Sequence, residues 1–183
     1  LQFTYFGTTV KPPKADGGEW VWVGYIPENC DAGQYRLTLN RDHEKFNYAI
    51  SAKNYHDFTL TAKYKNFGAW NNHMGIELVF DDGNGSFING IYLEFDTWSD
   101  KLSFVNGFID SDQTGSHYAI QNLINTEETV VKSGYGFADR LNGDGVILTV
   151  VRSGNKVSVI VDGKYAATLT LPEEYANRKA IYA

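Results

Sequence analysis

The chain contains few residues of several types, and each scarcity excludes a class of structure or partner. Cys30 is the only cysteine among 183 residues, so an intramolecular disulfide cannot form. No apolar run approaches the ~20 residues that a membrane-spanning helix requires, so we expect no membrane insertion. Lysine and arginine form no cluster and the formal net charge is −6, which argues against nucleic acid as a partner.

Aromatic residues and glycine are abundant instead. Aromatic side chains make up 15% of the chain and glycine occurs 18 times, which favours a β-protein with many turns. The length suits a single domain, 1–183, with a sizeable core. Because the chain begins at Leu1 rather than at a methionine, we expect it to be part of a larger protein with other domains.

Short alternating segments separated by turn residues predict the fold class. Strands are expected at 57–65, 74–80, 88–97, 102–109 and 117–123. The segments 146–152, 156–161 and 165–171 predict an antiparallel meander, followed by a helical turn within 173–179 and a strand from Ala180. About a dozen short strands in one domain predict an all-β, two-sheet antiparallel β-sandwich of the jelly-roll type.

The segment 91–100 brings together carboxylate and aromatic side chains and is the main candidate for a functional site. Side chains alternate across a strand, so Tyr92, Glu94, Asp96 and Trp98 are expected on one face and the apolar residues of 91–97 on the core face. Neighbouring carboxylates repel each other unless solvent, a proton or a cation intervenes. A calcium ion would relieve that repulsion, and an aromatic ring beside it would offer a sugar a stacking platform.

The order of residues here resembles the L-type, legume-lectin-like family, whose domains have a concanavalin A-like sandwich. Glu94-x-Asp96-Thr97-Trp98-x-Asp100 is followed by Asp112 and, five residues later, His117. The resemblance implies a calcium ion and a second, transition metal side by side. It implies these metal ligands: Glu94 and His117 at the transition metal, Asp96 and Asp112 bridging both ions, and the Trp98 carbonyl with Asp100 at calcium.

A polar and aromatic loop at 66–72 is a second candidate for sugar contact, because loops on a rigid scaffold often carry binding. The prediction is a non-catalytic carbohydrate-binding domain of a secreted or cell-surface bacterial protein that binds a glycan or polysaccharide. The expected sugar-binding residues are Trp98, Trp70, Asn71 and Asn72.

Three alternatives compete with that interpretation. Glu94 and Asp96 could belong to a solvated edge strand, and Asp112 with His117 to an ordinary surface loop. A laminin-G-like adhesion domain would bind protein instead. Glucanases on such sandwiches carry E-x-D-x-E or E-x-D-x-x-E on one strand, with two carboxylates about 5 to 5.5 Å apart. Here Trp98 or Ser99 takes the third position, so we do not expect an enzyme.

Overall fold

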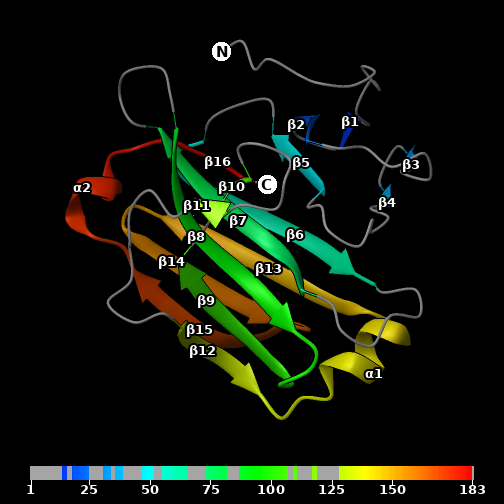
Figure 1. Ribbon diagram of the computed structural model, residues 1–183. Coiled ribbons are helices and arrows are strands. Elements are labelled where there is room, and N and C mark those ends of the chain that lie inside the picture. The colour runs from blue at the N-terminus through cyan, green and yellow to red at the C-terminus, as the bar shows by residue number, and fades with distance from the viewer. Residues whose placement is uncertain are drawn as a thin grey trace.

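The computed structural model describes residues 14–15, 18–24, 31–33, 36–38, 47–51, 55–65, 73–81, 87–106, 109–110, 117–118 and 128–182, with side chains described over 55–65, 74–81, 90–106 and 128–180. Two antiparallel sheets pack face to face (Figure 1). The first has five strands in the order β12 (Glu128–Ser133), β9 (Lys101–Asn106), β8 (Phe87–Asp96), β7 (His73–Asp81) and β16 (Ala180–Tyr182). The second has the order β15 (Lys164–Thr170), β14 (Lys156–Val161), β13 (Val146–Ser153) and β6 (Phe58–Tyr64).

Smaller pairings complete the described strands. They are β1 (Lys14–Ala15) with β2 (Gly18–Gly24) and β5 (Asn47–Ser51), β3 (Asp31–Gly33) with β4 (Arg36–Thr38), and β10 (Ile109–Asp110) with β11 (His117–Tyr118). Two short helices, α1 (Phe137–Asn142) and α2 (Glu173–Ala176), lie at opposite ends of the sandwich (Figure 1). None of the described helices is long and apolar enough to cross a membrane.

The predicted all-β sandwich is confirmed, and its last three long strands form the expected meander. The helical turn within 173–179 is α2, and the strand from Ala180 is β16. Within the strand expected at 102–109, the structure describes β9, which ends at Asn106, and β10, which begins at Ile109 and pairs in a different sheet. Helix α1 was not predicted at all.

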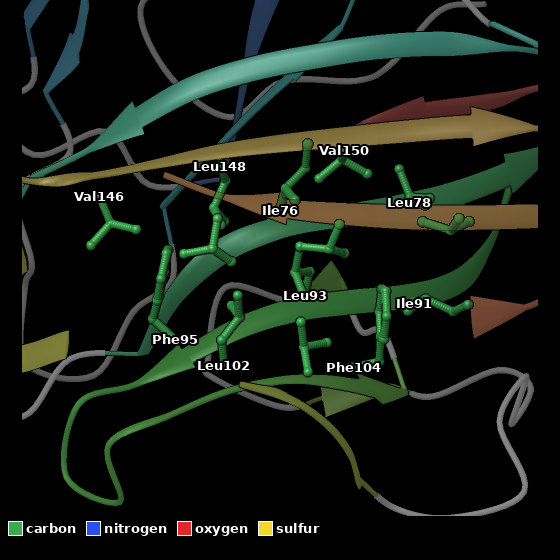
Figure 2. Close-up of a cluster of buried hydrophobic side chains, with 14 of the residues drawn as sticks. Ile76, Leu78, Ile91, Leu93, Phe95, Leu102, Phe104, Val146, Leu148 and Val150 are labelled. Atoms are coloured by element: carbon green, nitrogen blue, oxygen red, sulfur yellow. The ribbon is translucent and has the colours of Figure 1, made fainter. Parts of the chain in front are cut away.

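The core lies between the two sheets (Figure 2). Alternation along each strand sends one set of side chains inward, where apolar burial contributes about 1.5–3 kcal/mol for each large aliphatic or aromatic group. The inward residues of the central strands are Ile76, Leu78 and Phe80 on β7, Ile91, Leu93 and Phe95 on β8, Leu102 and Phe104 on β9, Val146, Leu148 and Val150 on β13, and Val157, Val159 and Val161 on β14.

A buried arginine closes one end of this core. Arg152 is 1% exposed and donates hydrogen bonds to the carbonyls of Tyr175, Arg178 and Tyr55. Its guanidinium carbon also lies 5.0 Å from the centre of the Phe80 ring. Burial lowers the Arg152 pKa from its ordinary value, and the nearby charge of Asp57 opposes that shift. The side chain therefore ties β13 to α2 and to the residues that connect α2 with β16.

Candidate functional site

The outer face of the five-stranded sheet, which points away from the core, collects the polar side chains of three neighbouring strands. Residues directly opposite each other in an antiparallel pair project to the same side. Glu94 on β8 lies opposite Gly75 on β7 and Ser103 on β9, and Asp96 lies opposite Lys101. The inward residues Ile91, Leu93 and Phe95 are at most 2% exposed, whereas Glu94 and Asp96 are only partly buried. The two faces predicted for the segment 91–97 are confirmed.

Trp98 stands on the turn that follows β8. One carboxylate oxygen of Asp96, Oδ1, accepts hydrogen bonds from the backbone N–H of Trp98 at 2.9 Å and of Ser99 at 3.1 Å. An aspartate that binds the amides two and three residues ahead fixes a tight turn. Thr97 is buried, while the Trp98 side chain is 79% exposed, the most of any described large hydrophobic residue. The turn therefore presents the indole ring to solvent on a fixed support.

Asp100 ends the same turn and holds it to helix α1. Its backbone is left-handed, with φ of 50°. Its carboxylate accepts the N–H of Gly136 at 3.0 Å and of Phe137 at 2.6 Å, and its carbonyl accepts the N–H of Gly134 at 3.1 Å. Both carboxylate oxygens of Asp100, which was predicted as a calcium ligand, thus accept backbone hydrogen bonds. This capping role was missed because Gly136 and Asp100 are 36 residues apart.

The structure describes the other predicted metal ligands only in part. Asp112 lies outside the described residues, and the structure describes the backbone of His117 in β11 but not its side chain. Among the described residues, no three or more histidine, cysteine, aspartate or glutamate side chains come together to hold a metal ion. The described part of the predicted set does not fit a metal centre by itself, so the calcium and transition-metal assignments stay predictions. The predicted sugar-binding residues Trp70, Asn71 and Asn72 also lie outside the described residues.

Glu128, which sequence reasoning missed, joins the site from the edge strand β12. Its carboxylate accepts hydrogen bonds from the Ser103 hydroxyl at 2.5 Å and the Lys101 ammonium at 3.3 Å. The Ser103 hydrogen bond holds the pKa of Glu128 below its ordinary value, assisted by Lys101 and opposed by burial and by the negative charge of Asp96. Glu128 is therefore ionised near neutral pH and lies within electrostatic reach of Asp96.

Glu77, which sequence reasoning also missed, lies on the same sheet, but its pKa is shifted in the opposite direction to that of Glu128. The residue is 3% exposed and projects away from the core, opposite Tyr92. Its Oε1 atom is buried and has no hydrogen-bond partner. Burial raises the pKa of Glu77 well above its ordinary value, and a hydrogen bond with the Gly90 backbone only partly opposes the shift. A buried carboxyl with one unpaired oxygen is most stable in the neutral, protonated form.

Comparison with known proteins adds evidence on the fold. No protein-family model and no curated protein matches the chain. Among solved structures, it resembles the carbohydrate binding module CBM66 from Bacillus subtilis, with 11% identity and a TM-score of 0.53, covering 94% of this chain and 91% of that one. It also resembles a Bacillus licheniformis β-glucanase, with 16% identity and a TM-score of 0.52, covering 96% and 84%.

At these identities the likeness shows the fold alone. The jelly-roll sandwich expected from the sequence is confirmed, whereas membership of the L-type lectin family stays a prediction.

Proposed function

We propose that this chain is a non-catalytic carbohydrate-binding domain whose ligand stacks on Trp98 beside the outer face of the five-stranded sheet. The observation that carries the proposal is the display of Trp98, which is 79% exposed on a turn fixed by Asp96 and Asp100. A rigid aromatic ring supplies a large contact area with little loss of conformational entropy. The CBM66 module that shares this fold is named for carbohydrate binding, which supports the same class of ligand.

The carboxylates beside Trp98 suit the hydroxyl groups of a glycan. An ionised carboxylate only accepts hydrogen bonds, and such charge-assisted bonds are stronger than neutral ones. Glu94 and Asp96 lie two residues apart on the outer face, next to the turn that carries Trp98. We propose that they accept hydrogen bonds from ligand hydroxyls while the sugar ring lies on the indole. Because the proposed ligand is a glycan or polysaccharide, the proposal includes a secreted or cell-surface location.

Calcium belongs to the proposal as a separate hypothesis. The hydrogen bonds of Asp96 and Asp100 already hold the turn, which is the role expected of the ion. Any metal here would depend on the side chains of Asp112 and His117 as well. Carboxylate and carbonyl oxygens are the donors that calcium prefers, so the bound ion would add rigidity rather than reactivity.

A glycoside hydrolase is the second candidate, and Glu77 is the observation that favours it. A carboxyl group held neutral by burial has the protonation state that an acid catalyst needs, and Glu77 shares the outer side of the sheet with Glu94. An acid catalyst must reach its substrate, and Glu77 is only 3% exposed. The burial of Glu77 therefore favours a binding role for the domain. Release of reducing ends from a polysaccharide by the wild type but not by Glu94→Gln would replace the binding proposal with this one.

The decisive measurement is affinity for a panel of plant, algal and bacterial polysaccharides, with Trp98→Ala as the test variant. We expect this substitution to weaken binding by at least about tenfold, equivalent to about 1.4 kcal/mol. Tyr165→Ala is the matched control, because Tyr165 is 68% exposed but lies on β15 of the other sheet. Equal losses in both variants, or none in Trp98→Ala, would contradict the proposed site.

Two substitutions of Asp96 separate its structural role from its charge. Asp96→Asn keeps an oxygen that can accept the amides of Trp98 and Ser99, whereas Asp96→Ala removes it. Repeating the panel with calcium and then with EDTA tests the metal hypothesis. Binding that is lost in EDTA would establish it, and binding that is unchanged would remove calcium from the site.

A further inference from the structure

The turn after β8 is held by a loop that contains two glycines. The amides that bind Asp100 belong to Gly134, Gly136 and Phe137, at the junction of β12 and α1, and this junction lies beside the turn (Figure 1). Both glycines have left-handed backbones, with φ of 63° and 70°. Because glycine populates left-handed and right-handed conformations about equally, the glycines themselves do not fix this loop. The only side chain between them is that of Tyr135.

Tyr135 is anchored to β12 and to α1. The centre of its ring lies 4.3 Å from the Lys132 ammonium nitrogen and 4.0 Å from the Arg140 guanidinium carbon, within the range of cation–π attraction. The ring centre is also 5.4 Å from that of Phe137. The Nε atom of Arg140 donates a hydrogen bond to the Tyr135 carbonyl at 2.8 Å. These contacts hold both the side chain and the backbone of Tyr135 against the helix.

The Tyr135 hydroxyl connects the loop to the opposite sheet. It donates a hydrogen bond to Oδ2 of Asp162 at 3.0 Å, and Asp162 lies in the tight turn between β14 and β15. The Oδ1 atom of Asp162 accepts the backbone N–H of Ile147 on β13 at 2.8 Å, and the Asp162 N–H donates to the Ile147 carbonyl at 2.9 Å. The acceptor of the Tyr135 hydrogen bond is therefore itself held in place by the four-stranded sheet.

We propose that Tyr135 is a positioning residue of the Trp98 site, and that the four-stranded sheet determines through Asp162 how firmly the indole ring is presented. The contacts run from Asp162 to Tyr135, from the loop amides to Asp100, and from Asp100 to the turn that carries Trp98. A ligand that stacks on a ring already held in place loses less conformational entropy on binding. The inference rests on the proposed function and adds to that site a control from the opposite sheet.

Two substitutions loosen this anchor without removing its bulk. Tyr135→Phe keeps the ring but loses the hydroxyl, and Arg140→Met keeps an unbranched side chain but loses the guanidinium. NMR relaxation gives the order parameter of the Trp98 backbone N–H, which is about 0.85 in rigid backbone and below about 0.6 in flexible backbone. We expect a value near the rigid limit in the wild type and a fall of about 0.1 or more in both variants.

The same proteins are compared by affinity electrophoresis in gels that contain hydroxyethylcellulose, xylan, galactomannan or alginate. We expect both variants to bind about threefold or more weakly than the wild type to any of these polymers whose binding is lost in Trp98→Ala. Urea titration sets a temperature at which each protein is folded. A difference at Trp98 then reports its positioning and not a population of unfolded chains.

Each variant has a control that makes the same chemical change elsewhere. Tyr165→Phe removes a hydroxyl that donates to Oγ1 of Thr168 at 3.2 Å within β15. Arg178→Met removes a guanidinium that lies 5.4 Å from the ring centre of Tyr175, beside α2 at the opposite end of the sandwich. We expect neither control to change the Trp98 order parameter or the affinity.

An unchanged order parameter at Trp98 in Tyr135→Phe and Arg140→Met would overturn the positioning role, and so would equal changes in the two controls. A less ordered Trp98 turn that binds as tightly as the wild type would overturn it as well, because the positioning would then not matter to the ligand. If none of the polymers binds in a way that depends on Trp98, the proposed function fails. The relaxation measurement needs no ligand, so in that case it still decides whether Tyr135 positions the turn.

Discussion

Glu77 shows how a single buried group can make the stability of the whole domain depend on pH. The carboxyl group is 3% exposed and its Oε1 atom has no hydrogen-bond partner. Burial raises its pKa above the ordinary value of 4.5, so the folded chain holds a proton that the unfolded chain releases. The stability contributed by this proton is complete below about pH 4.5. It is lost as the pH rises toward the folded pKa.

Glu77→Gln should therefore remove part of the pH dependence of the free energy of unfolding. The wild-type free energy of unfolding should fall above pH 4.5 with a slope of up to about 1.4 kcal/mol per pH unit for this proton. The variant should lose this component of the slope and be more stable than the wild type at pH 8. Urea unfolding from pH 4 to pH 9 checks this, with the exposed Glu173→Gln as the control. Parallel curves for wild type and Glu77→Gln would contradict the assignment of a buried, protonated carboxyl.

At the scale of elements, the turn 97–100 and helix α1 depend on each other. The helix has only six residues, too few to be stable alone in water, and its first amides have no side-chain cap from Gly136. The carboxylate of Asp100 accepts the N–H of Gly136 and of Phe137 instead. The turn therefore starts the helix, and the helix fixes the end of the turn that carries Trp98.

Asp100→Ala should cost about 2 kcal/mol of unfolding free energy, because two amide groups lose a charged acceptor. Asp100→Asn should cost less, since asparagine tolerates the left-handed backbone and keeps one carbonyl oxygen. Chemical denaturation of the three proteins measures these differences. Asp144→Ala, at an exposed position after the same helix, is the control. A loss in Asp100→Ala no larger than in the control would show that this cap contributes little.

At the scale of the whole molecule, the two sheets and α1 meet at Phe95. Its ring is fully buried, with its centre 5.4 Å from that of Tyr64 on β6 and 5.2 Å from that of Phe137 on α1. Aromatic pairs at such distances add to the stabilisation from buried area. One side chain therefore connects the five-stranded sheet, the four-stranded sheet and the helix.

Phe95→Ala should lower the free energy of unfolding by about 3–5 kcal/mol, because it leaves a cavity between all three elements. Val130→Ala is the contrasting variant, since Val130 is 47% exposed on β12 and its truncation should change stability by less than about 0.5 kcal/mol. Equilibrium denaturation followed by circular dichroism compares them. Similar midpoints for the two variants would mean that the sheets are not held together at Phe95.

Much of the architecture could be predicted because the alternation of apolar and polar residues along short segments indicates strands and their faces. Alternation within 91–97 predicted a core face and a polar face, and both are present. Turn residues at 153–155 and 162–164 predicted the meander of β13, β14 and β15. Helix α1 was missed because its capping residue, Asp100, comes from a turn far away in the sequence.

The sequence by itself determined the sandwich fold and the outward direction of Glu94 and Asp96, since a strand with two unlike faces has only one favourable way to bury the apolar one. Only the tertiary structure decided which other groups join them. Lys101 and Glu128 are 27 residues apart and meet because β9 pairs with β12. Whether a carboxyl is neutral, as Glu77 is, or ionised, as Glu128 is, depends on burial and on partners from other strands, and no local pattern of residues carries that information.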